Sequence, residues 1–177
     1  MDTATRARLV LVEDDQATLE VFSIVLGERY VVFGYGSAVE ALKAIDSAKP
    51  DVLVLDIGMR PVDGVQCLKM IRATPGYRDI PAVALTGFAR DVERRSFLDR
   101  GFQAVVVKPI FDPEELIDVI ERLLKSAAAV PPTPTHPRRG SALPTRSAAA
   151  AQLDAQAAMT ASPAGGGPAD TDGREPG

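Results

Sequence analysis

The stretch Val52-Leu53-Val54-Leu55-Asp56-Ile57-Gly58 decides the fold class of this chain. Its four successive apolar residues, two of them β-branched, predict a strand that is buried on both faces, as strands of parallel sheets are. The run ends at Asp56. Because open α/β sheets bind their ligands at the carboxyl ends of the strands, Asp56 stands where a reactive group is expected. The alternative is that Asp56 only marks the end of the strand, since aspartate is common in turns.

The composition is that of one well-cored domain. The chain has 177 residues, 46% of them apolar, and is too short for two domains of ordinary size. A net charge of −4 argues against a general affinity for nucleic acid or anionic membranes, and the single cysteine, Cys67, excludes a disulfide framework and a structural zinc site. No apolar run reaches membrane-spanning length and the N-terminus lacks a signal-peptide core, so we expect a cytoplasmic protein.

Apolar runs that alternate with helical patterns predict the rest of the sheet. Besides the run at 52–55, strands are expected at residues 9–12, 30–33, 81–86 and 105–107, with Gly34-Tyr35-Gly36 closing the second of these five. Ser37 and Asp112 are expected to cap the helices that follow them. The helical patterns are about a dozen residues long, which gives five βα units and a parallel sheet with helices on both faces. Right-handed crossovers favour the doubly wound, flavodoxin-like strand order 2-1-3-4-5, which groups the acidic strand ends.

The composition changes after Lys125. In residues 126–177 more than half of the residues are Ala, Pro or Gly, and large apolar side chains are scarce. Such a segment cannot bury enough apolar area to offset the entropy that is lost when it orders. We therefore expect one domain over residues 7–125 and a disordered tail over residues 126–177, which contains the single histidine, His136.

Polar or charged side chains follow four of the five predicted strands: Glu13-Asp14, Asp56, Thr86 and Lys108. Three carboxylates that converge repel one another unless a cation lies between them, and hard oxygen ligands with open positions suit Mg²⁺. A carboxylate nucleophile, a hydroxyl and an ammonium beside such a metal would form a phosphoryl-transfer site. Taken one at a time, the acidic residues would only complement a helix dipole, Thr86 would be a turn residue and Lys108 a surface lysine.

Five segments together resemble the receiver domain of bacterial two-component response regulators. They are Leu11-Val12-Glu13-Asp14-Asp15, Val54-Leu55-Asp56-Ile57-Gly58-Met59, Val62-Asp63-Gly64, Ala84-Leu85-Thr86-Gly87 and Val107-Lys108-Pro109. Their order and separations also fit, and the resemblance covers residues 7–125. It implies a stand-alone receiver, similar to chemotaxis regulators, that works as a phosphorylation-dependent signalling switch.

The resemblance also implies the role of each acidic residue. Asp56 looks like the phosphoacceptor, which takes its phosphoryl group from a histidine kinase or a histidine phosphotransfer protein. Glu13 and Asp14 match the acidic pair that holds Mg²⁺, with Asp14 the direct ligand and Asp56 beside it. The backbone carbonyl of Gly58 matches a further ligand.

Two more residues would complete the switch by the same resemblance. The hydroxyl of Thr86 is expected to move onto the aspartyl phosphate, and Lys108 is expected to pair with it. A cis peptide bond is expected before Pro109. No enzymatic activity is expected beyond Mg²⁺-dependent self-phosphorylation and self-dephosphorylation of the aspartate.

Two residues depart from the usual receiver pattern. Arg60 stands four residues after Asp56, where receivers often have proline, and Val105 stands where many have Tyr or Phe. Valine cannot make the exposed-to-buried exchange of that aromatic ring. These departures favour an alternative, a receiver-shaped adaptor or scaffold that works without phosphorylation, whereas intact Asp56, Thr86 and Lys108 oppose it.

Two other classes of α/β protein are excluded by their motifs. Phosphatases of the haloacid dehalogenase type need a second aspartate two residues after the first, and Gly58 occupies that place. A dinucleotide-binding domain needs Gly-x-Gly-x-x-Gly after a strand, and the candidate that begins at Gly34 has Val39 at the third position.

The expected partners are a sensor histidine kinase or histidine phosphotransfer protein and a downstream protein of unknown identity. The output would be protein–protein contact or phosphorelay. No DNA-binding domain and no membrane are expected among the partners, and a homodimer is left open. A candidate contact surface carries Arg90, Arg94, Arg95 and Arg100; the alternative is a solvated helix whose acidic residues balance them.

Overall fold

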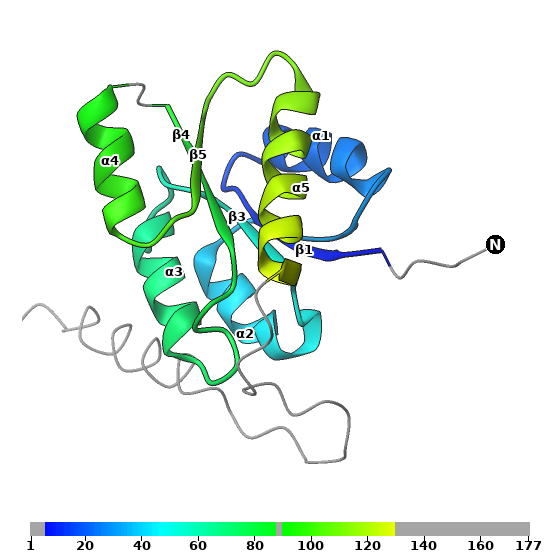
Figure 1. Cartoon of the computed structure of the whole chain (residues 1–177), viewed down its shortest axis with the longest axis vertical. Coiled ribbons are helices and arrows are strands. Elements are labelled where there is room, and N and C mark those ends of the chain that lie inside the picture. The colour runs from blue at the N-terminus through cyan, green and yellow to red at the C-terminus, as the bar shows by residue number, and fades with distance from the viewer. Residues whose placement is uncertain (1–5, 88–89, 130–177) are drawn as a thin grey trace, which may run out of the picture.

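The computed structural model describes residues 6–87 and 90–129, which form a five-stranded parallel sheet with helices on both faces (Figure 1). The strands stand in the order β2-β1-β3-β4-β5, so the predicted fold class is confirmed. In chain order the elements are β1 (Arg8–Val12), α1 (Gln16–Gly27), β2 (Val31–Tyr35), α2 (Ala38–Ala48), β3 (Val52–Asp56), α3 (Gly64–Ala73), β4 (Ala82–Thr86), α4 (Asp91–Asp99), β5 (Ala104–Val107) and α5 (Pro113–Ala129).

The central strand β3 joins the two cores of the domain. All of its residues are buried, and it lies between β1 and β4. Leu53 and Leu55 pack in the cluster that contains α2 and α3, whereas Val52 and Val54 pack in the cluster that contains α1 and α5. Because successive side chains of a strand point to opposite faces, a strand covered on both faces needs an unbroken apolar run. Each such side chain contributes roughly 1.5–3 kcal/mol by its burial.

The register of the sheet aligns the ends of the strands that carry polar residues. Val12 of β1 pairs with Leu55 of β3, so the next residue of each strand reaches the same edge of the sheet. Thr86 of β4 pairs with Val107 of β5, which places Lys108 one step farther. The backbone N–H of Lys108 donates to the carbonyl of Thr86 at 2.7 Å, which holds these two strand ends together.

The second strand is longer than expected. β2 runs through Tyr35, so the prediction that Gly34-Tyr35-Gly36 closes the strand was wrong. Gly34 pairs with Leu11 inside the sheet. A Cβ at Gly34 would lie 3.0 Å from Oγ of Ser23 and 3.2 Å from Cδ1 of Leu19, so this glycine lets α1 pack closely on the strand. The glycine serves helix packing rather than a turn.

Both predicted helix caps are present. Oγ of Ser37 accepts a hydrogen bond from the backbone N–H of Glu40 at 3.3 Å, at the start of α2. Oδ1 of Asp112, the residue before α5, accepts a hydrogen bond at 3.0 Å from the backbone N–H of Glu114 in the first turn of that helix. Each cap satisfies one of the donors that a helix leaves without a partner in its first turn.

The last helix continues beyond the predicted end of the domain. α5 extends to Ala129, four residues past Lys125, because alanine has the highest helix propensity and prolongs a helix that is already formed. The domain boundary at residue 125 stays a prediction. The remainder of the predicted tail, residues 130–177, lies outside the described residues together with His136.

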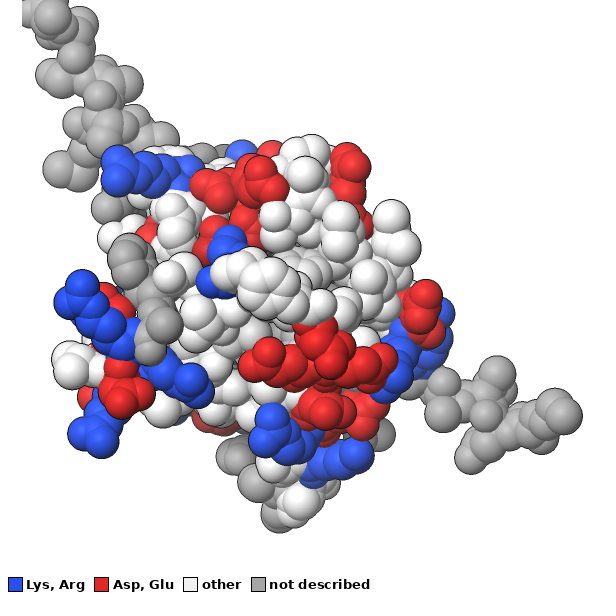
Figure 2. All heavy atoms as spheres, turned by 90° about the horizontal axis from the view of Figure 1, so that it is seen from above, with Lys and Arg blue, Asp and Glu red and all other residues white. Residues whose placement is uncertain are grey.

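The helix α4 is attached less firmly than its neighbours, since none of its side chains is buried. Phe97 packs against the core at its edge and meets the ring of Phe102 edge-on, with 6.5 Å between the ring centroids. In Figure 2, basic side chains lie at the left, over α4, and acidic side chains gather below the centre, over α5. The arginines expected to mark a contact surface, at positions 90, 94, 95 and 100, are exposed. Their role as a contact surface stays a prediction.

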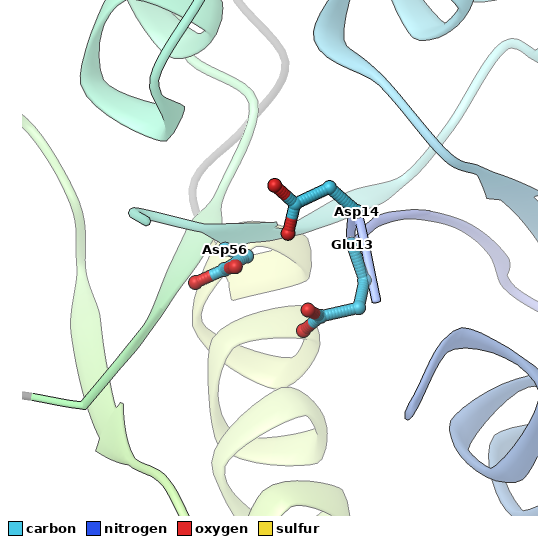
Figure 3. Close-up of side chains that lie close together, drawn as sticks. All are labelled: Glu13, Asp14 and Asp56. Carbon is cyan, nitrogen blue, oxygen red and sulfur yellow. The ribbon is translucent and has the colours of Figure 1, made fainter. Parts of the chain in front are cut away.

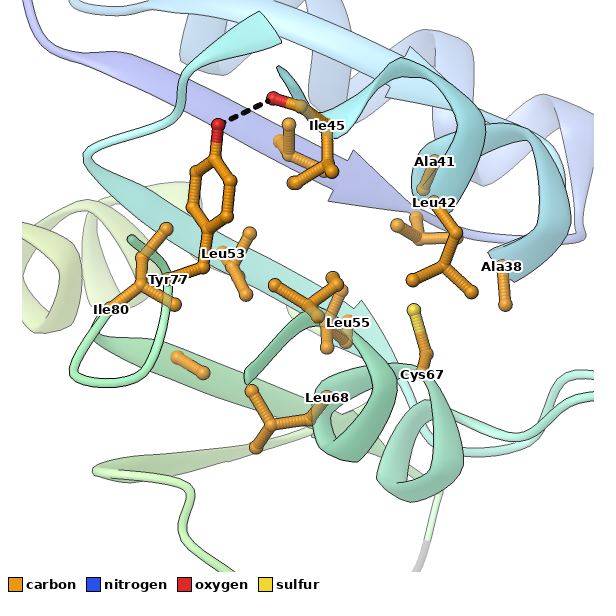
Figure 4. Close-up of a cluster of buried hydrophobic side chains, with 14 of the residues drawn as sticks. Ala38, Ala41, Leu42, Ile45, Leu53, Leu55, Cys67, Leu68, Tyr77 and Ile80 are labelled. Carbon is orange, nitrogen blue, oxygen red and sulfur yellow. Dashed lines mark hydrogen bonds between the residues drawn. The ribbon is translucent and has the colours of Figure 1, made fainter. Parts of the chain in front are cut away.

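Tyr77 fastens the loop between α3 and β4 to α2. The residue is 3% exposed, and its hydroxyl donates to the backbone carbonyl of Ile45 at 3.1 Å (Figure 4). Burial, followed by the influence of Asp46, raises the pKa of Tyr77 to about 12. We expect Tyr77→Phe to lower the free energy of unfolding by about 1–2 kcal/mol, because a buried hydrogen bond is lost. Urea denaturation at pH 7 measures this difference.

The matched control for this change is Tyr35→Phe. Tyr35 is half-buried, and its hydroxyl makes no hydrogen bond to any described residue. The same chemical change at this position should cost less than about 0.5 kcal/mol. Equal losses at the two positions would show that the hydrogen bond to Ile45 adds nothing to stability.

Cys67 faces the core from α3 and is fully buried (Figure 4). Burial, with a smaller contribution from the charge of Asp63, raises the pKa of the Cys67 thiol to about 12. Since the thiolate is the reactive form, a thiol with so high a pKa reacts slowly at pH 8. We expect the folded protein to react with iodoacetamide at pH 8 far more slowly than the same protein in guanidinium chloride. Comparable rates, followed by mass spectrometry, would contradict the burial of this thiol.

Candidate functional site

Three carboxylates lie together at the ends of β1 and β3 (Figure 3). Glu13, Asp14 and Asp56 each offer an oxygen atom, and these atoms lie within 4.8 Å of one another. Glu13 and Asp56 are buried, with exposed fractions of 0% and 4%, whereas Asp14 is exposed. The structure therefore brings together the acidic residues that the sequence singles out at the ends of these strands.

Lys108 closes the cluster from the end of β5. Its Nζ lies 2.9 Å from Oε2 and 3.2 Å from Oε1 of Glu13, and 3.2 Å from Oδ2 of Asp56. The lysine side chain is 26% exposed, and those of the two acids are nearly inaccessible. One ammonium thus bridges two buried carboxylates from different strands.

The charges in this cluster shift the acid–base properties of two groups. Burial raises the pKa of the Glu13 carboxyl and the charge of Asp56 raises it further, against the opposing hydrogen bond from Lys108. Burial alone would lower the pKa of Lys108, but the hydrogen bond and charge of Glu13, together with Asp56, raise it above the ordinary lysine value. The lysine is therefore held in its charged form at neutral pH.

Backbone groups complete the surroundings of Asp56. The N–H of Gly58 donates to Oδ1 of Asp56 at 3.0 Å, which fixes one carboxylate oxygen. Thr86 is the last residue of β4, which pairs in parallel with β3, so it lies at the same edge of the sheet as Asp56. Thr86 is buried, with 1% of its surface exposed. The Lys108–Pro109 peptide bond is cis, as expected, and the Arg60–Pro61 bond is cis as well.

The donor set fits a magnesium ion. Oxygen atoms of carboxylates are the ligands that Mg²⁺ prefers in proteins, and three of them converge here from two strands. Asp14 is exposed, so it is accessible from solvent. Receiver domains generally bind Mg²⁺ at such an acidic pocket. The expected part of the Gly58 carbonyl as a further ligand stays a prediction.

Three residues near the site have structural roles that the sequence did not reveal. Asp15 caps α1, since its Oδ1 accepts from the N–H of Thr18 at 2.8 Å, and these hydrogen bonds hold the pKa of Asp15 below its usual value. Asp63 caps α3 in the same way. Gly64 lies against the backbone of Asp56, and a Cβ there would collide with the Asp56 carbonyl oxygen. The Asp63-Gly64 dipeptide is typical of a helix start, and it was the feature of the sequence from which the cap of α3 could have been predicted.

The chain belongs to the response regulator receiver domain family, whose pattern it matches over residues 9–121. It is 32% identical over 123 residues to an uncharacterized 14.6 kDa protein of Leptolyngbya boryana, a match that covers 69% of this chain and 93% of that protein. It is 32% identical over 126 residues to the DNA-binding response regulator MtrA of Mycobacterium bovis, a match that covers 71% of this chain and 53% of MtrA. The structure is similar to that of the chemotaxis protein CheY4 of Vibrio cholerae, with a TM-score of 0.63 and 26% identity over 67% of this chain and 99% of CheY4.

Family membership confirms the resemblance that the strand-end motifs indicated. The chain is a receiver of two-component signalling, a family of phosphorylation-dependent switches rather than of enzymes in the usual sense. The expected cytoplasmic location stays a prediction. Within the described residues, no helix has the length and apolar character that crossing a bilayer requires.

The predicted set of partners was wrong. It named a kinase or phosphotransfer protein and a downstream protein, and it excluded a DNA-binding domain. The chain spans 53% of MtrA, and MtrA is a DNA-binding response regulator. Relatives of this receiver therefore include proteins with DNA-binding output, and the strand-end motifs carry no information about such a domain, because they lie wholly within the receiver.

The contact between Gly64 and Asp56 gives a test of the local backbone. We expect Gly64→Ala to destabilise the protein by about 1–3 kcal/mol and to displace the end of β3, because the added methyl group overlaps the Asp56 carbonyl. Urea denaturation measures the loss of stability. Gly27→Ala is the matched control, since a Cβ at Gly27 meets no atom within 4 Å, and it should leave stability unchanged or slightly higher. Equal effects would contradict the close approach at Gly64.

Proposed function

We propose that this receiver accepts a phosphoryl group on Asp56 from a phosphohistidine of a donor protein. The observation that carries the proposal is the bridge from Lys108 Nζ to Asp56 Oδ2, 3.2 Å, at the end of a buried strand beside two further acids. In the transfer, an Asp56 oxygen forms a bond to phosphorus as the bond from phosphorus to the donor nitrogen breaks. The electron pair of that bond stays with the imidazole.

Lys108 is proposed to stabilise the phosphorylated state. Its ammonium lies 3.2 Å from Asp56, close enough to pair with a phosphoryl oxygen carried by that residue. The same group lies 2.9 Å from Glu13, which restrains it in position before phosphorylation. Glu13 would in this way position Lys108 as well as contribute to the metal site.

Glu13, Asp14, Asp56 and the carbonyl of Gly58 are proposed to hold Mg²⁺. When bound, the ion supplies positive charge that offsets the negative charge of the phosphoryl oxygens. Because Asp14 is exposed while Glu13 is buried and paired with Lys108, Asp14 is the better candidate for a direct ligand.

Thr86 is proposed to report the phosphorylated state. It lies at the end of β4, next to β3, and its backbone carbonyl accepts from the N–H of Lys108. A hydroxyl on this strand end would donate to the aspartyl phosphate and carry the change toward α4, which follows in the chain. Output would proceed by contact between proteins or by relay of the phosphoryl group to another histidine.

One observation favours a second function, that of a phosphorylation-independent adaptor. Val105 is 8% exposed and packs in the core cluster to which α2 and α3 belong. A small aliphatic side chain in this position has no ring to exchange between solvent and core. The adaptor would keep the fold and the surface of α4 without using Asp56.

Incubation with Mg²⁺ and acetyl phosphate separates the two functions. We expect intact-mass analysis to show one added phosphoryl group on the natural protein and none on Asp56→Asn. The substitution removes the nucleophilic carboxylate while keeping its shape. Asp118→Asn, the same change at an exposed position of α5, is the matched control and should accept the group as the natural protein does.

Beryllofluoride, which imitates a phosphoryl group without a covalent donor, gives an independent measurement. Mg²⁺-dependent binding of beryllofluoride that Asp56→Asn abolishes would support phosphorylation at Asp56. This holds even for a receiver that does not react with small phosphodonors. If neither an adduct nor beryllofluoride binding is found, phosphorylation at Asp56 is contradicted and the adaptor function is supported.

A further inference from the structure

An open pocket adjoins the acceptor carboxylate on the side of the loop between β3 and α3. Its volume is about 740 Å³, and it is lined by Ile57, Gly58, Met59, Arg60, Pro61, Asp63 and Gln66. Gly58 joins this pocket to the site, because a Cβ at Gly58 would lie 3.6 Å from both carboxylate oxygens of Asp56. Gly58 thus borders both the pocket and the carboxylate of the proposed nucleophile.

The charged side chains that line the pocket are Arg60 and Asp63. Asp63 is engaged, since its Oδ1 accepts from the backbone N–H of Gln66 at 2.7 Å as the cap of α3. Arg60 is exposed and makes no hydrogen bond or ion pair with any described residue. Its guanidinium is therefore available to an anion.

The remainder of the site explains why an anionic donor would need such a cation. With Mg²⁺ bound as proposed, the ion and Lys108 together only balance the charges of Glu13, Asp14 and Asp56, so they leave no excess positive charge for the donor. A guanidinium presents a planar fork of donors that matches carboxylate and phosphate oxygens. Arg60 lies at a position where the receiver pattern often has proline, so this cation is a feature of the present chain.

We propose that Arg60 is a specificity-determining residue that binds low-molecular-weight acyl phosphates in this pocket during phosphorylation of Asp56. The inference rests on the proposed function of Asp56. An Asp56 oxygen forms the new bond to phosphorus, the bond between phosphorus and the acyl oxygen breaks, and its electron pair leaves with the carboxylate. The donor dianion and the aspartate carry three negative charges, as do the aspartyl phosphate and the released carboxylate, so no proton is transferred.

The test measures the initial rate of phosphorylation against acetyl phosphate concentration at saturating Mg²⁺. We expect Arg60→Ala to raise the concentration for half-maximal rate about fivefold, as for the loss of one partly exposed charged contact, with the maximal rate unchanged. Arg60→Lys, which keeps the positive charge, should give a half-maximal concentration between those of Arg60→Ala and the natural protein. Added NaCl should raise the half-maximal concentration of acetyl phosphate more for the natural protein than for Arg60→Ala, since salt screens the charge that the variant lacks.

Arg78→Ala is the matched control. Arg78 is exposed, lies in the loop that leads into β4 at the other edge of the sheet, and makes no hydrogen bond or ion pair with the described residues. The Arg78→Ala variant should have the same half-maximal concentration of acetyl phosphate and the same maximal rate as the natural protein. Equal shifts for Arg60→Ala and Arg78→Ala, or a lower maximal rate with an unchanged half-maximal concentration, would overturn the inference.

Beryllofluoride binding separates this inference from the proposed function. We expect Arg60→Ala to bind beryllofluoride with Mg²⁺ as tightly as the natural protein, because the acceptor site is unchanged. If the natural protein binds beryllofluoride but is not phosphorylated by acetyl phosphate, the role of Arg60 is overturned and that of Asp56 stands. If it does neither, both are overturned.

Discussion

The site depends on the balance between three carboxylates and one ammonium. Like charges about 4 Å apart repel by about 4 kcal/mol at the effective dielectric constant of a protein surface. Lys108 offsets this repulsion by lying against Glu13 and Asp56 together. The sheet keeps these groups in place because each lies at or just after the carboxyl end of one of its strands. The excess of negative charge that remains is the physical reason why the site suits a divalent cation.

Much of the fold could be predicted because the parallel sheet requires an unusual sequence pattern. Unbroken apolar runs such as 52–55 occur where a strand is covered on both faces, and the helices between the runs leave few arrangements of the chain. The errors fell where a residue type has two uses. Gly34 appeared to end a strand, yet it lies inside β2 to admit α1. The predicted boundary at Lys125 is not among these errors: α5 continues to Ala129, and the boundary stays a prediction.

That the candidate site residues lie near one another could be predicted because they end or closely follow strands, and parallel strands end at one edge. Sequence alone does not give the distances, which depend on register and on side-chain conformation. The contact of Gly64 with the Asp56 backbone was missed for that reason. The partners could not be predicted either. The motifs of a receiver are complete within its own sheet, and they are the same whatever domain the receiver controls.

The weak attachment of α4 has a thermodynamic consequence. A helix without buried side chains, held at its edge by the ring of Phe97, requires little free energy to shift or to unravel locally. A phosphoryl group can contribute only a few charged contacts, so it can redistribute a population only between states of similar free energy. If Asp56 is phosphorylated as proposed, α4 is therefore the helix whose displacement from the sheet would cost the least free energy.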